Sequence, residues 1–242
     1  MHAESEGIAI SIIIPAFNSA AVIGDCLTAL NRQDVSRNRY EIIVVDDGSQ
    51  DATAEIAQSL ADEVIRTDNR GPASARNTGA RAARGDILLF TDADCIPEQP
   101  WVRRMTAPFE SSDIHGVKGA YLTRQTRWVA RFVQAEYESK YRFMSRFDTI
   151  DFIDTYSAAF RRRTFLELNG FDETFPGASV EDQEFSFRMS AEGYTMVFVA
   201  DARVLHRHAD TLAWYFRKKF NIGYWKVKVL RRHPGKTVSD TH

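Results

Sequence analysis

Short apolar runs alternate along the first hundred residues with segments whose apolar positions recur every three or four residues. The run at 8–18, IAISIIIPAFN, is β-branched nearly throughout and predicts a strand that is buried on both faces and ended by Pro15. The next segment repeats apolar residues at helical spacing, and Asn18 or Ser19 is positioned to cap that helix.

The same alternation continues to residue 94. The expected elements are, in order, a strand at 41–45, a helix at 51–60, a strand at 63–67, a helix at 73–83 and a strand at 86–94. This rhythm of strands and helices predicts a parallel, doubly wound α/β sheet.

Beyond Pro97 the rhythm becomes less regular. The expected elements are a helix, a strand near 115–123, a long helix at 128–146, a strand and short helix within 156–175, a helix at 180–193, a strand at 194–200 and a C-terminal helix. Gly193 is predicted to terminate the helix that precedes it.

Composition narrows the class of protein. The 242 residues suffice for one α/β domain, and a net charge of −2 gives no overall field that would attract nucleic acid. Cys26 and Cys95 form no C-x-x-C pair, which argues against a zinc site or a disulfide framework. The N-terminus does not resemble a signal peptide, and no apolar segment is long enough to span a bilayer. A cytoplasmic protein without a nucleic-acid partner is therefore expected.

Acidic residues follow two of the predicted strands. Asp46 and Asp47 follow the second strand, and Asp92 and Asp94 end the fourth. Ligands of open α/β sheets bind beyond the carboxyl ends of the strands, and two carboxylates one residue apart suit a hard divalent cation that also holds phosphate oxygens. Turn formation alone would explain one such pair, whereas two pairs at one sheet edge favour a binding site.

Arg76 lies in the helix predicted at 73–83, which begins beside the same edge. A guanidinium and the free amides of a helix N-terminus both bind phosphate. The alternative is an exposed arginine on the helix surface.

Five segments, taken in order, resemble the family 2 glycosyltransferases, which are inverting enzymes of the GT-A fold. They are SIIIPAFN, IIVVDDGSQDAT, GPASARNTGARAARGDILLFTDAD, FLELNGFDETF and EDQEFSFRMSAEG, and the resemblance extends over about residues 8–225. It implies a single catalytic domain at 1–242, with a Rossmann-like, mostly parallel sheet flanked by helices. Its parts would be a nucleotide-sugar-binding half at 8–96, an acceptor and catalytic half at 97–210, and a basic aromatic segment at 211–242.

The resemblance also implies roles for individual residues. Pro15, Ala16 and Phe17 would line the nucleobase and ribose pocket, and Asp47 would form a hydrogen bond to the base. Arg76 would contact the base or diphosphate, and Asp92 and Ala93 would contact the nucleotide sugar. Asp94, with Asp92 and His206, would bind Mn²⁺ or Mg²⁺. Asp182, supported by Glu181, would be the catalytic base. The competing interpretations are charge complementarity with a helix N-terminus for the two acids and an ordinary structural role for the histidine.

The predicted function is inverting, non-processive transfer of a sugar from a nucleotide diphosphate sugar, with a UDP-sugar as the first candidate, to a glycan or lipid-linked acceptor. The Q-x-x-R-W motif of processive members is absent, which favours single addition. The alternative is a non-catalytic module of the same fold that only binds nucleotide sugars. A receiver-like domain would not explain Glu181 and Asp182, and a dehydrogenase would need a G-x-G-x-x-G after the first strand.

Basic and aromatic residues alternate between residues 211 and 236, where no acidic residue occurs. This pattern suits peripheral binding to an anionic membrane, at the inner face of the cell membrane. Alternatively, the aromatic residues complete the core and the basic residues form a solvated helix face.

Overall fold

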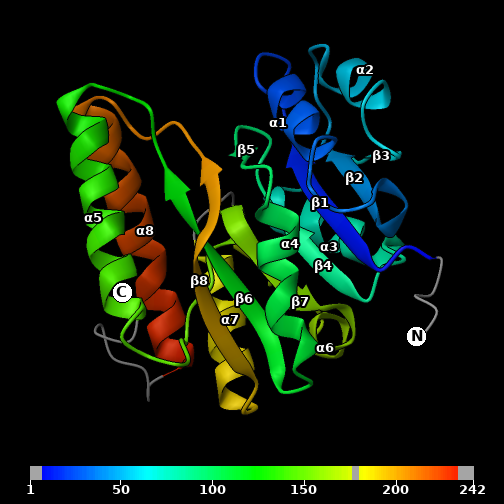
Figure 1. Cartoon of the computed structure of the whole chain (residues 1–242). Coiled ribbons are helices and arrows are strands. Elements are labelled where there is room, and N and C mark those ends of the chain that lie inside the picture. Colours follow the sequence, from blue (N-terminus) through cyan, green and yellow to red (C-terminus); the bar gives the residue numbers. More distant parts are fainter. Residues whose placement is uncertain (1–6, 176–179, 234–242) are drawn as a thin grey trace.

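A computed structural model describes residues 7–175 and 180–233. In this part of the chain, eight strands form one sheet in the order β3-β2-β1-β4-β7-β6-β8-β5 (Figure 1). The strands are β1 (Ile10–Ala16), β2 (Tyr40–Asp46), β3 (Glu63–Arg66), β4 (Ile87–Phe90), β5 (Ile96–Pro97), β6 (Ile114–Leu122), β7 (Ala158–Arg161) and β8 (Thr195–Leu205). The α-helices are α1 (Ile23–Leu30), α2 (Thr53–Gln58), α3 (Pro72–Ala82), α4 (Trp101–Thr106), α5 (Trp128–Met144), α6 (Arg162–Glu167), α7 (Glu181–Ala191) and α8 (Leu212–Arg232). Single turns of 3₁₀ helix lie at Arg37–Arg39, Ala107–Glu110 and Thr155–Ser157.

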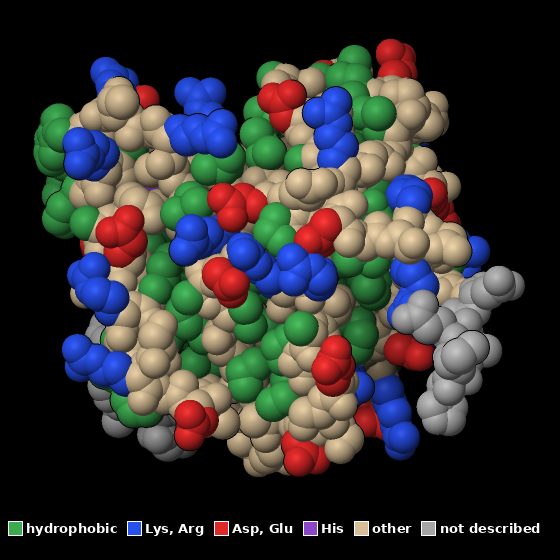
Figure 2. All heavy atoms as spheres, viewed as in Figure 1, with side chains coloured by type: hydrophobic (Ala, Val, Ile, Leu, Met, Phe, Trp, Pro, Cys, Tyr) green, Lys and Arg blue, Asp and Glu red, His purple; other side chains and the backbone are tan. Residues whose placement is uncertain are grey.

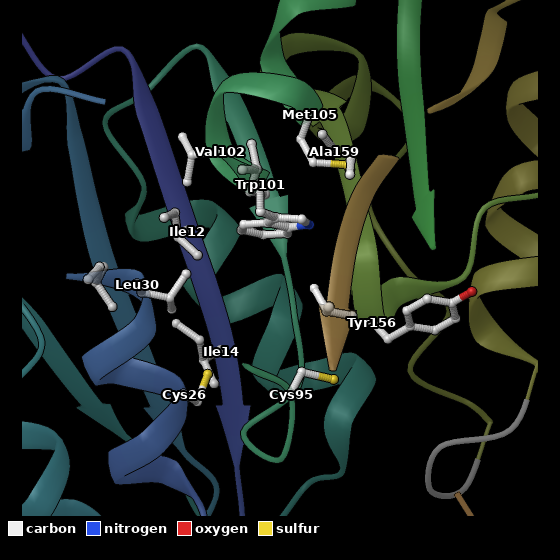
Figure 3. Close-up of a cluster of buried hydrophobic side chains, with 14 of the residues drawn as sticks. Ile12, Ile14, Cys26, Leu30, Cys95, Trp101, Val102, Met105, Tyr156 and Ala159 are labelled. Carbon is white, nitrogen blue, oxygen red and sulfur yellow. The ribbon is translucent and has the colours of Figure 1, made fainter. Parts of the chain in front are cut away.

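The strands of the N-terminal half are parallel, as the strand–helix rhythm predicts. Alternate residues of β1 enter different cores. Ile12 and Ile14 pack with side chains of α1 and α4 (Figure 3), whereas Ile13 packs with alanines of α3 on the opposite face. Helices therefore cover both faces of the sheet, which is why the strand is apolar at nearly every position.

Pro15 does not end the first strand, because β1 continues to Ala16. Pro15 stands opposite Val45 of β2, and the pairing of β1 with β4 stops at Ile13 and Phe90. The carbonyl of Ala16 accepts a hydrogen bond from the residue after β2, so the backbone nitrogen of Pro15 points the other way, past the end of β4. A proline fits there because no ladder hydrogen bond is lost.

The predicted cap of the first helix is wrong. Val22 occupies the cap position without a side-chain hydrogen bond, and the carbonyl of Ser19 accepts from the backbone amides of Val22 and Ile23. Asn18 instead joins two loops: its amide donates to Ser49 Oγ at 2.9 Å, and its Oδ1 accepts from the amide of Gln50 at 2.9 Å. This polar residue therefore fixes the loops after β1 and β2 against each other.

The C-terminal half adds mixed pairing to the parallel sheet. β7 lies antiparallel between β4 and β6, and β6 runs parallel to β8. The register between β6 and β8 shifts between Lys118 and Ala120, where a side chain on Gly119 would collide with Ser157 Oγ at 2.0 Å. Gly193, with a φ of 78°, follows α7 as predicted.

Helices α5 and α8 lie side by side along one flank of the molecule (Figure 1). Phe132 of α5 contacts Tyr215 of α8 edge to face, with 5.8 Å between the ring centroids. Glu136, one turn further along α5, accepts from Lys219 at 3.1 Å. Of the described helices, none combines the length and apolar character that crossing a bilayer requires.

Candidate active site

The loops after β1, β2 and β4 meet at one edge of the sheet and carry the predicted donor-site residues. Ala16 and Ala93 are buried, whereas Phe17 is exposed. The carboxylate of Asp47 accepts hydrogen bonds from Thr67 Oγ1 at 2.8 Å and from the amides of Arg70 and Gly71 at 2.8 and 2.7 Å. Asp47 thus fixes the loop that leads into α3. Its hydrogen bond to the base remains a prediction.

Asp46 has a structural role that differs from that of Asp47. It is fully buried, accepts from the amide of Ser49 at 3.1 Å and pairs with Arg66 Nε at 3.1 Å. Asp46, the last residue of β2, and Asp47, the next residue, therefore organise different loops. Asp46 fixes the loop after β2, and Asp47 fixes the loop after β3.

Arg76 on α3 is a buried arginine between two carboxylates. Its Nη2 lies 2.7 Å from Asp92 Oδ1, after β4, and its Nη1 lies 3.0 Å from Glu181 Oε1, at the start of α7. Burial by itself would lower the pKa of Arg76, but the two carboxylates raise it. The exposed arginine considered from the sequence is excluded, since only 2% of the residue is exposed.

Asp94 and His206 come together from the ends of β4 and β8. Asp94 Oδ2 lies 3.7 Å from His206 Nδ1, and one possible ligand atom from each of Asp94, Cys95 and His206 lies within 4.8 Å of the others. Burial, and then the nearby His208, lower the pKa of His206 to about 3, so its imidazole is neutral at physiological pH and keeps a lone pair for a metal. Burial and the charge of Asp92 raise the pKa of Asp94 to about 6.

These donors fit a hard divalent cation. Carboxylate oxygens and an imidazole nitrogen suit Mn²⁺, and diphosphate oxygens or water would fill the other positions. Cys95, which the sequence analysis did not place here, is fully buried, and burial raises the pKa of its thiol, so it remains protonated. Asp94 and His206 are therefore the better ligands among the three.

Asp182 lies in the first turn of α7, next to Glu181. It is half-buried, and burial followed by the charge of Glu181 raises its pKa to about 7. Lys118 of β6 is fully buried nearby, and its ammonium pairs with Asp154. Burial lowers the pKa of Lys118 to about 7, while the charge of Asp182 favours the ammonium.

Sequence reasoning missed Lys118, although a signal was present. A lysine stands in the middle of the buried strand HGVKGAYL, where a charge needs a partner or a function.

A cavity of about 510 Å³ is lined by Lys118 and by Arg76, Asp92, Glu181 and Asp182, and residues of α5 and α8 cover it. A second hollow of about 530 Å³, next to Tyr194, lies away from the strand-end acids. The first cavity is therefore the candidate active site.

The chain belongs to glycosyl transferase family 2, whose profile matches residues 11–168, more than half of its length. It is similar to glycosyltransferase AglE of Haloferax volcanii, with 28% identity over 236 residues that cover 91% of this chain and 73% of AglE. Pre-mycofactocin glycosyltransferase of Mycobacterium tuberculosis is 26% identical over 240 residues, and the chain spans 49% of its length.

Solved structures share the fold. The mannosyltransferase PcManGT of Pyrobaculum calidifontis, in complex with GDP-Man and Mn²⁺, has a TM-score of 0.75 at 22% identity, covering 96% of this chain and 66% of its own. TarS 1–349 of S. aureus, in complex with UDP-GlcNAc, has a TM-score of 0.64 at 20% identity, covering 85% of this chain and 61% of its own. The predicted GT-A fold and glycosyltransferase class are thereby confirmed, and the roles of single residues remain predictions.

We expect Asp94→Asn to weaken Mn²⁺ binding more than about tenfold, because a neutral amide replaces a charged ligand, and His206→Ala to weaken it about tenfold. Paramagnetic resonance of free Mn²⁺, titrated with each variant in the presence of UDP or GDP, measures this. Asp201→Asn is the matched control, because Asp201 is an exposed acid on β8 paired with Arg104. Parent-like affinity of Asp94→Asn would move the metal to other ligands.

Proposed function

We propose that the chain is an inverting, non-processive glycosyltransferase that moves a sugar from a nucleoside diphosphate sugar to an acceptor hydroxyl. The observation that carries the proposal is the position of Asp182, a carboxylate with a pKa of about 7 in the same cavity as Arg76 and Asp92. A group with this pKa accepts protons efficiently near neutral pH.

The donor is proposed to bind across the loops after β1, β2 and β4. Pro15, Ala16, Phe17 and Asp47 would hold the nucleoside, and Asp92 and Ala93 the ribose and diphosphate. PcManGT is in complex with GDP-Man and TarS with UDP-GlcNAc, so a nucleotide-sugar donor is supported and the base is left open between the two. A UDP-sugar is the first donor to test.

Asp94 and His206, with Asp92, would hold Mn²⁺ or Mg²⁺. When bound, the cation neutralises charge on the leaving diphosphate. Arg76 is already engaged by Asp92 and Glu181, so we infer that it orients both acids in addition to its proposed contact with the donor.

In the proposed reaction, the acceptor hydroxyl attacks the anomeric carbon from the face opposite the diphosphate. Asp182 takes the hydroxyl proton as the new carbon–oxygen bond forms. The bond to the diphosphate breaks, and its electron pair leaves with the nucleoside diphosphate. Glu181, held by Arg76, keeps the first turn of α7 in place and raises the pKa of its neighbour.

The pH dependence of kcat/KM tests the proposal that Asp182 is the catalytic base. Because the pKa of Asp182 is raised to about 7, the residue is mostly protonated at low pH and cannot accept a proton. We expect kcat/KM to rise about tenfold per pH unit on the acid side and to level off above about pH 8. Asp182→Asn should lower kcat by about 10²- to 10⁴-fold and leave nucleotide binding nearly unchanged.

Release of free nucleoside diphosphate, measured with acceptor present, reads out this prediction. Glu192→Gln is the control, because Glu192 is an exposed acid at the opposite end of the same helix. More than about a tenth of parental turnover in Asp182→Asn would assign the proton to Glu181 or another group. An absence of turnover in the parent with every nucleotide sugar and acceptor tried would favour the non-catalytic binding module.

Peripheral binding to an anionic membrane is the second part of the proposal. Aromatic residues on the two flank helices are exposed, among them Trp128 and Phe132 of α5 and Phe216, Phe220 and Tyr224 of α8. Lysine and arginine side chains (blue) accompany them along the left side of Figure 2. This supports the membrane interpretation over a role of these rings in the core; Lys236 lies outside the described residues.

Liposome flotation tests this surface. We expect the protein to float with vesicles rich in phosphatidylglycerol at low salt and to be released as salt rises, since surface charge pairs are screened. Phe216→Ser combined with Phe220→Ser should lower the floating fraction several-fold, because each ring buries apolar surface in the interface. Vesicles of phosphatidylcholine alone are the control, and equal flotation with both vesicle types would refute electrostatic attachment.

A further inference from the structure

Lysine side chains line the part of the cavity that lies under the two flank helices. Lys118 comes from β6, Lys140 from α5, and Lys218, Lys219 and Lys226 from α8. The family resemblance gave these five residues no role, and the proposed chemistry does not use them.

On the sheet side of the cavity, the charges are already paired. Arg76 forms ion pairs with Asp92 and Glu181. Lys118 pairs with Asp154 and also lies over the rings of Phe152 and Tyr156. Little of this positive charge is left for a ligand.

The helix side of the cavity carries more basic than acidic side chains among its described lining residues. Among the described lining residues of α5 and α8, Glu136 is the single carboxylate, and it already accepts from Lys219 Nζ at 3.1 Å and the Tyr215 hydroxyl at 3.2 Å. Burial, and then the charge of Lys219, lower the pKa of both Lys140 and Lys226. Lys140, Lys219 and Lys226, here called the lysine cluster, therefore repel one another around one acid.

A ligand with several anionic oxygens would offset this repulsion. Charge-assisted hydrogen bonds from ammonium groups to phosphate oxygens are among the stronger polar contacts in proteins, and they strengthen away from bulk water. Phosphate offers more acceptor oxygens than carboxylate and up to two negative charges, which suits three ammonium groups.

The lysine cluster is separate from the candidate metal site. Lys218 is the α8 lysine whose charge acts on Asp94 and on His206, which places it at the donor end of the cavity. The charges that act on Lys140 and Lys226 belong to residues of α5 and α8. This assigns an anion at the cluster to the acceptor, and the donor diphosphate to the strand ends.

Aliphatic side chains and tyrosine rings of α5 and α8 line the same cavity as the cluster. They are Val133, Tyr137, Tyr141 and Met144 of α5 and Ile222 of α8. A phosphate joined to an apolar chain would therefore find partners for both parts.

We propose that the lysine cluster is the phosphate subsite of the acceptor, so that the sugar is transferred to a molecule that carries a phosphate ester. The inference rests on the proposed function, because it places the acceptor hydroxyl within reach of Asp182. The phosphate belongs either to a lipid with an apolar chain or to a soluble glycan.

Calorimetric titration of the full chain tests the subsite with geranyl phosphate, geraniol and glucose 1-phosphate as probes. We expect geranyl phosphate to bind at least about tenfold more tightly than geraniol, and Lys140→Gln/Lys226→Gln to lose at least about tenfold of that affinity. Lys228→Gln should stay within about twofold, because Lys228 lies on the same helix over Phe175 and does not line the cavity. Equal melting temperatures of the variants show that each is folded.

Glucose 1-phosphate distinguishes a phosphate carried by a lipid from a phosphate carried by a soluble glycan. Binding weaker than that of geranyl phosphate supports a lipid-borne phosphate, and equal binding supports a soluble phosphorylated acceptor. The inference is overturned if geraniol binds as tightly as geranyl phosphate, or if the double lysine variant binds like the parent.

Titration of the parent with UDP and GDP in the presence of Mn²⁺ runs in parallel. Nucleotide binding without phosphate binding would overturn this inference alone. Phosphate binding without nucleotide binding would overturn the proposed function, and with it the assignment of the phosphate to an acceptor.

Discussion

The buried guanidinium of Arg76 joins the two halves of this molecule. It comes from α3, which packs on the parallel strands, and it holds Asp92 after β4 and Glu181 at the start of α7. Glu181 lies 105 positions from Arg76 in the sequence, so these ion pairs fix the end of β4 against the start of α7. Removing one partner from a buried ion pair leaves an uncompensated charge, which makes the arrangement costly to disturb.

This constraint separates the roles of neighbouring acids. Arg76 engages Glu181, whereas Asp182 remains beside the cavity with its pKa raised to about 7. Asp92 is likewise engaged, and Asp94 is free to face His206 at 3.7 Å. In these two pairs of neighbouring acids, Arg76 holds one carboxylate, and the other is the proposed base or the proposed metal ligand.

The parts of the fold that depend on local pattern could be predicted from the sequence. β1, β2 and α3 were found because β-branched runs and helical spacing are visible within a few residues. The antiparallel position of β7 depends on pairing with distant strands, and Pro15 stays in its strand because β4 ends early. The family motifs indicated Arg76 and Asp182, but the burial of Lys118 and the lysine cluster arise only when β6, α5 and α8 come together.

The most direct test of the role of Arg76 is the free energy of unfolding of Arg76→Met, measured with urea. Methionine keeps much of the side-chain volume but removes the guanidinium that pairs with the buried carboxylate of Glu181, so we predict a loss of about 3 kcal/mol or more. Arg163→Met removes an exposed ion pair with Glu167 on α6 and should cost much less, because solvent screens the pair. A loss for Arg76→Met as small as that of Arg163→Met would contradict the view that this arginine holds the two halves of the site together.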